Sequence, residues 1–200
     1  MKSIGDSMPN DALLAVLSAI DAANAADPNS EPDGRPAAIV YGERMSEELA
    51  RRSPGASEHL QIAARGQHVE RWKIARADYP DGRAGYLRWR TDQARAHAER
   101  VTGLMADAGY GPEDRDRVAR LLRKEGIKRN PEMQMLEDVI CFVFLRWYFA
   151  DFAVKHADED IERIVAKTAR KMSPEARATA LAEFDLPPAL AQSFTEDAVR

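Results

Sequence analysis

Apolar residues recur every three or four positions through almost the whole sequence, which is the spacing that places them on one face of an α-helix. An early example is the set Leu13, Leu17 and Ile20. No run shows the alternation of apolar and polar residues that a half-buried β-strand requires. We therefore predict an all-α fold.

Prolines and glycines divide the chain into helical segments, because proline favours the first turn of a helix and glycine favours its end. The predicted helices cover residues 10–27, 36–52, 57–76, 85–108, 112–126 and 131–155, followed by a late helix from Ser173 and a short segment over 187–200. Residues 139–149 are apolar nearly all round, which is typical of a helix surrounded by others. We expect a single-domain helical bundle over 1–200 around this central helix, with an N-terminal helix within 1–27 and a core at about 36–172.

The composition predicts a water-soluble chain in a reducing compartment. The most apolar run, Val139 to Leu145, is followed by Arg146 and is much shorter than the roughly 18 residues of a membrane span. The first residues, Met1 to Asp6, lack the apolar centre of a signal peptide, and the single Cys141 cannot form a disulfide framework. We expect a cytoplasmic protein that does not insert into a membrane.

Charge is distributed unevenly, although the net charge is only -4. Residues 61–130 contain 16 basic and 10 acidic residues, whereas both flanking segments are net acidic. A small anionic substrate, or RNA, would be attracted to this middle segment. The alternative is that these arginines only form solvated helix faces.

The helical register separates the four histidines. His97 shares the apolar stripe of the fourth predicted helix, and His68 lies in register with Trp72 on the third. We expect His59 at the surface and His156 as a helix cap. A polar side chain on an apolar stripe is costly without a partner, so His68 and His97 are candidates for a shared site.

A third candidate position comes from the pair Glu137-Asp138, where the central helix becomes wholly apolar. Adjacent helix positions differ by about 100°, so only one of the two carboxylates points along a given inward direction. We favour Asp138, because it aligns with the polar Gln134.

His68, His97 and Asp138 thus form a predicted site for a divalent metal ion (Mn, Mg, Zn or Fe), since imidazole and carboxylate are suitable ligands. No compact metal-binding motif supports the set. The alternative is a buried network without metal, in which Asp138 orients one histidine and pairs with Arg65 or Arg90.

The reaction that fits such a site is metal-dependent hydrolysis of a phosphate ester or nucleotide, because a bound metal lowers the pKa of its water. Glu137 would be the general base, and Arg65, Arg71 and Arg90 would hold the phosphate. Two other functions stay open: a non-catalytic module that binds an anionic metabolite or RNA, and a helical di-iron oxidase. The oxidase ranks lowest, because the sequence lacks the required set of Glu and His pairs.

Several segments resemble the domain of unknown function 4202 family. They are Ala63–Trp72, Tyr79-Pro80, Gly85–Arg90, His97-Ala98 and Glu132–Val139. The resemblance runs from about residue 41 to residue 173, and it implies no activity.

A weaker resemblance is to the HD-type metal phosphohydrolases, which are all-helical and bind metal through a His, a His-Asp dyad and a later Asp. It implies that His68, His97 and Asp138 fill these roles, with the two histidines in either order. The sequence departs from the pattern, because Val69 follows His68 and Ala98 follows His97 where the dyad has Asp.

Overall fold

The computed structural model describes residues 11–127 and 129–195. In these ranges it contains helices and no β-strand, which confirms the predicted all-α fold. The chain divides into two compact units, one of residues 1–46 with 55–125 and one of residues 47–54 with 126–200. The one-domain boundaries given above stay a prediction, and each unit is described by itself.

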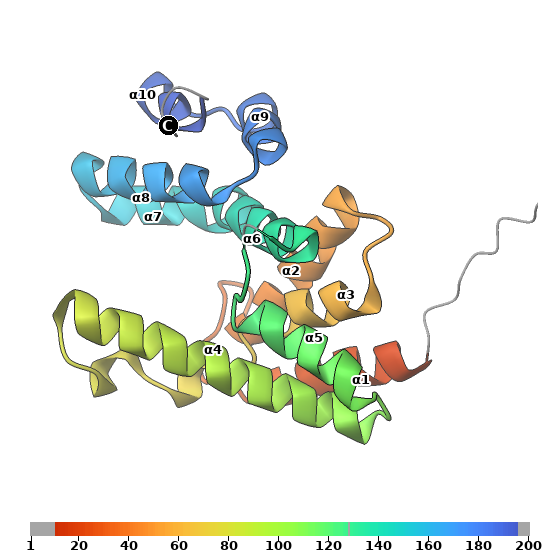
Figure 1. The fold of residues 1–200 in the computed structure, drawn as a ribbon. Coiled ribbons are helices and arrows are strands. Elements are labelled where there is room, and N and C mark those ends of the chain that lie inside the picture. Colours follow the sequence, from red (N-terminus) through yellow and green to blue (C-terminus); the bar gives the residue numbers. More distant parts are fainter. Residues whose placement is uncertain (1–10, 128, 196–200) are drawn as a thin grey trace, which may run out of the picture. The chain divides into compact units, whose positions relative to one another are not determined.

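The first unit contains α1 (Asp11–Asn24), residues 37–46 of α2 (Ala37–Arg52), α3 (Glu58–Arg65), α4 (Gly82–Asp107) and α5 (Pro112–Leu122). The long helix α4 packs along α5, and α1 contacts both α3 and α4 (Figure 1). These helices bury one apolar face each, with Val16, Ile20, Ile62, Val101 and Val118 fully enclosed. Burial of such side chains is the main source of stability in a bundle of short helices.

The helix predicted over 57–76 is shorter in the structure, so that prediction is wrong beyond residue 65. Gly66 ends α3, and a Cβ at this position would lie 2.6 Å from Cγ2 of Val101 on α4. The absence of a side chain at Gly66 therefore allows α4 to approach closely at this point. Glu70 then adopts φ 50°, in the left-handed region, which is incompatible with a continuing helix. His68 therefore lies in a turn and not on a helix.

The second unit contains residues 47–52 of α2, α6 (Pro131–Val143), a π-helical segment (Phe144–Tyr148), α7 (Phe149–Lys155), α8 (Asp158–Lys171), α9 (Pro174–Glu183) and α10 (Pro188–Ala191). The predicted central helix over 131–155 is thus helical throughout, with a π-segment in the middle. Cys141, Phe142 and Leu145 are buried in a core with residues of α8, α9 and α10, whereas residues 146–149 keep part of their surface exposed. The helix is enclosed over its first part only. No helix within the described ranges is long and apolar enough to cross a membrane.

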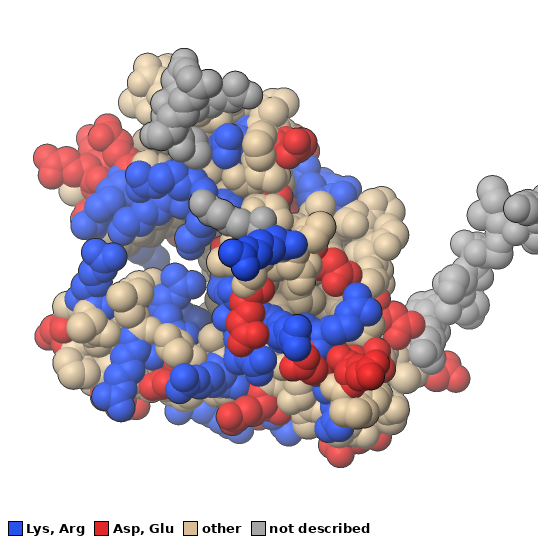
Figure 2. Space-filling view, viewed as in Figure 1, with Lys and Arg blue, Asp and Glu red and all other residues tan. Residues whose placement is uncertain are grey.

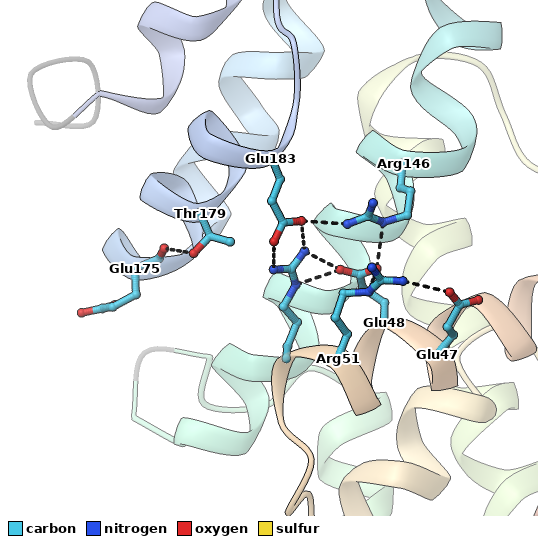
Figure 3. Close-up of polar contacts among 8 residues, drawn as sticks. Glu47, Glu48, Arg51, Arg146, Glu175, Thr179 and Glu183 are labelled. Carbon is cyan, nitrogen blue, oxygen red and sulfur yellow. Dashed lines mark hydrogen bonds and ion pairs between the residues drawn. The ribbon is translucent and has the colours of Figure 1, made fainter.

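A charged network holds α2, the π-segment and α9 together within this unit (Figure 3). Glu48 is completely buried and accepts hydrogen bonds from Arg52 Nε at 2.8 Å and Arg146 Nε at 3.0 Å. Glu183 accepts two bonds of 2.6 Å from Arg52 and one of 2.8 Å from Arg146. These bonds, those of Arg52 first, lower the pKa of Glu183 to about 2. The two glutamates and the two arginines balance in charge, so we interpret the network as structural.

Candidate functional site

Two buried amides hold the turn that follows α3. Oδ1 of Asn24 accepts a bond of 2.9 Å from the backbone N–H of Glu70. Nε2 of Gln93 donates to the carbonyl oxygens of Arg71 at 2.8 Å and of Ile74 at 3.0 Å. Because Asn24 lies on α1 and Gln93 on α4, the position of the turn is fixed by contacts that are distant in sequence.

The turn brings His68 against two other rings of the first unit. The ring of Tyr41, on α2, stacks on the imidazole of His68 with 3.8 Å between ring centroids and an interplanar angle of 15°. The imidazole of His97, on α4, lies 6.2 Å from that of His68. The structure therefore brings two of the predicted site residues together, although His68 is not on the helix that was predicted to place it there.

Both imidazoles are neutral at neutral pH. Burial, then the charges of Arg71 and Lys124, lower the pKa of His97 to about 3. The pKa of His68 lies well below its ordinary value, chiefly because of burial, with further contributions from Arg71, His97, Lys124 and Arg90. The surroundings of the pair are thus buried and positive, a combination in which a negative group would be stabilised.

Arg71 and Arg90, whose charges act on His68, lie against aromatic rings. The guanidinium of Arg71 lies 4.7 Å from the ring centroid of Trp89, and that of Arg90 lies 5.9 Å from the ring of Tyr86. Burial lowers the pKa of Arg71. Within residues 11–127 and 129–195, no carboxylate pairs with either arginine. The rings fix the direction of both cations without neutralising their charge.

Lys124, whose charge acts on both imidazoles, adopts a backbone conformation that usually requires glycine. It follows the end of α5 with φ 59°, and its N–H donates to the carbonyl of Leu121. This conformation costs a residue with a side chain about 1–2 kcal/mol, and helices commonly place glycine there. Such local strain is concentrated at functional sites. The cost is consistent with a requirement for an ammonium group at this position.

Two buried nitrogen atoms of this unit have no hydrogen-bond partner among the described residues: Nε2 of His97 and Nε2 of Gln67. His97 is 5% exposed and Gln67 is 6% exposed. A buried polar group without a partner costs about 1–3 kcal/mol. Arg71 and Lys124 act on His97 with positive charge, so a negatively charged hydrogen-bond acceptor would be favoured at its Nε2.

Arg65, predicted as an anion contact, is engaged elsewhere in the first unit. Its Nε and one terminal nitrogen donate to the two carboxylate oxygens of Asp21 at 2.7 and 2.5 Å, and its other terminal nitrogen contacts Ser46. This two-point ion pair neutralises the guanidinium. Of the three predicted arginines, Arg71 and Arg90 have no counter-ion among the described residues, and Arg65 stabilises the packing of α1 on α3.

Asp138 belongs to the second unit, where it supports the start of α9. It accepts bonds from the backbone N–H and the hydroxyl of Ser173 at 2.8 and 2.7 Å, and from Gln134 at 3.0 Å. Burial raises its pKa. Glu137 is 2% exposed and Asp138 is 5% exposed, so the expectation that only Asp138 turns inward is wrong.

No group of three His, Cys, Asp or Glu in the described ranges is arranged to hold a metal. The metal site and the general-base role of Glu137 stay predictions.

Tyr41, Lys124 and Gln67 were not predicted as site residues. Tyr41 lies on α2 and Lys124 in the turn after α5, and neither position shows a pattern distinct from a helix surface. The one available signal was Gly126, two residues after Lys124, which marks a helix end.

Comparison with known proteins gives a family and no activity. No curated protein and no solved structure matches the chain. A family model described as a domain of unknown function (DUF4202) matches residues 14–193, which covers nearly the whole sequence. The likeness to HD-type phosphohydrolases stays a prediction. The chain therefore belongs to the DUF4202 family, as the motifs in its sequence implied.

Proposed function

We propose that the protein binds a small phosphate-bearing molecule at the site formed by His68, His97, Arg71, Arg90 and Lys124 in the first unit. The observation that carries the proposal is the buried Nε2 of His97, which has no partner among the described residues. A neutral imidazole can donate one hydrogen bond from this nitrogen, and a phosphate oxygen would accept it.

The charges around the histidines favour an anion over a cation. Arg71 and Lys124 both lower the pKa of His97, which means that they repel positive charge at this position. Arg71 is already oriented by Trp89, so little conformational entropy is lost when it binds a ligand. A phosphate would satisfy the imidazole and neutralise the guanidinium at the same time.

The test is isothermal titration calorimetry with inorganic phosphate and small phosphate esters. Arg71→Gln should weaken binding about tenfold, because a charge-assisted hydrogen bond contributes about 1.5–3 kcal/mol. Arg88→Gln is the matched control, because it also replaces one arginine with glutamine. Arg88 lies on α4 with 77% of its side chain exposed, and its guanidinium is 3.9 Å from the carboxylate of Asp92. Equal affinities of the native protein and the Arg71 variant would contradict the proposal.

Metal-dependent phosphate hydrolysis is the second candidate function. The two neutral imidazoles favour it, because the deprotonated ring is the form that binds a metal. Incubation of phosphate esters with Mn²⁺, Mg²⁺, Zn²⁺ or Fe²⁺ separates the candidates. Metal-dependent release of phosphate would support a hydrolase with His68 and His97 as ligands. Saturable binding without release would support a binding module.

A further inference from the structure

A groove lies along α4, still within the first unit. It has a volume of about 360 Å³ and runs between α4 and the turn after α5. Its lining includes Leu87, Arg90, Thr91 and Arg95 of α4, and Arg123 and Lys124 of the turn. Pockets that hold small ligands commonly start at about this size.

The groove and the proposed phosphate site share two residues. Arg90 and Lys124 line the groove, and both also act on the imidazole of His68, whose pKa they help to lower. His97 itself lies on α4, three residues after Ala94 and seven after Arg90, so it is on the side of the helix that lines the groove. A ligand held at His97 can therefore extend past Arg90 into the groove. The two regions form parts of one binding surface.

Basic residues outnumber acidic ones in the lining of the groove. Of the residues that line it in the described chain, Glu125 is the acidic one, and it pairs with Arg123 at 2.7 Å. The side chain of Arg95 is 67% exposed, and its guanidinium lies 3.9 Å from the carboxylate of Asp92, beyond hydrogen-bond length. Figure 2 shows Lys and Arg side chains along α4, with Asp and Glu side chains among them. Arg95 is thus available for a second anionic group.

The groove also follows one face of α4. Positions 87, 90, 91, 94 and 95 are spaced three or four apart and lie on the same side of the helix. Arg90 and Arg95 are separated along the helix axis by about 7–8 Å, at about 1.5 Å per residue. This separation suits an extended chain of phosphates better than a single phosphate.

We infer that the site takes a ligand with several phosphate groups in series, one bound at His97 and Arg71 and the others in the groove at Arg90, Lys124 and Arg95. The inference rests on the proposed function, because it names the class of ligand for that same site. The repeated anionic groups would meet cations along their whole length, with Leu87 and Thr91 beside them.

The experiment compares inorganic phosphate, pyrophosphate and tripolyphosphate as probes in calorimetric titrations at one ionic strength. Native protein should bind tripolyphosphate at least about tenfold more tightly than phosphate, since each added charge-assisted bond contributes about 1.5–3 kcal/mol. Arg95→Gln should abolish most of this gain and leave phosphate binding unchanged. Arg71→Gln should weaken all three probes. Arg88→Gln, which makes the same charge change outside the groove, should retain the gain.

The two proposals fail in different ways. Equal affinities for the three probes, or a similar loss in Arg95→Gln and Arg88→Gln, would overturn the role of the groove and leave phosphate binding intact. No heat of binding with any probe would overturn the proposed function and the inference together. Far-ultraviolet circular dichroism of each variant establishes that it is folded before titration.

Discussion

The protein with His97→Gln should lose less stability in acid than the native protein. The imidazole is buried, and its pKa is about 3 in the folded chain against the ordinary value of 6.5. The folded state therefore binds fewer protons than the unfolded state between these values. The stabilising contribution is present above pH 6.5 and is lost as the pH falls towards 3.

The size of the effect follows from the shift in pKa. One pKa unit corresponds to about 1.36 kcal/mol, so the whole shift amounts to about 5 kcal/mol. Only part of this free energy is lost between pH 7 and pH 4.5, because the imidazole of the folded protein is still neutral at pH 4.5. Over this interval His97 alone should lower the free energy of unfolding by about 2.5 kcal/mol.

Urea unfolding of native protein and His97→Gln at pH 7 and pH 4.5 measures this contribution. Groups that titrate in both proteins cancel in the comparison, so the native protein should lose about 2.5 kcal/mol more than the variant. Glutamine is uncharged at both values and keeps a hydrogen-bond donor in the site. If the two proteins lost the same stability, His97 would titrate as an exposed residue, and the reasoning from burial and positive charge would be refuted.

Substitutions at three further positions give separate tests. Lys124→Gly should relieve the left-handed backbone and raise the free energy of unfolding by about 1 kcal/mol, while phosphate binding measured by calorimetry becomes weaker. A variant that loses stability as well as phosphate binding would contradict the account. Asp138→Ala should lower the free energy of unfolding by about 3 kcal/mol, because the bonds to Ser173 are lost, and Asp138→Asn should cost less. Gly66→Ala should cost about 1–3 kcal/mol in urea unfolding through its contact with Val101; an unchanged stability would show that α4 can move away.

Helix starts were predictable because their signals are local. Asn130 caps α6 by accepting bonds from the backbone of Glu132 and Met133, and Ser173 caps α9 in the same way. Each start is followed by proline at the first helical position. These residues determine the helix boundary without help from the rest of the chain.

The end of α3 was not predictable from local pattern. The segment 57–76 has apolar residues at helical spacing, yet after Gly66 the chain bonds to Asn24 of α1 and Gln93 of α4. These partners lie 46 and 22 residues from the groups they bind. Tertiary hydrogen bonds thus override the helical periodicity.

The histidine pair of the candidate site was predicted, but the predicted helical position of His68 was wrong. His68 and His97 were expected to meet because both occupy inward helical positions, and they do meet, but His68 arrives from a turn. Arg71 and Arg90 were identified from their charge and from their places near the two histidines in the sequence. The contribution of Lys124 depends on a left-handed conformation for which the sequence offers no glycine at that position.

The most direct test of anion binding is nuclear magnetic resonance of the ¹⁵N-labelled imidazoles during titration with inorganic phosphate. His59, paired with Asp114 at 2.8 Å, and His156, bonded to the carbonyl of Phe152 at 2.8 Å, lie outside the site and are internal references. We predict that the ring nitrogens of His68 and His97 shift in a saturable way while those of His59 and His156 stay constant. Unchanged signals from His68 and His97, or equal shifts of all four histidines, would contradict the account.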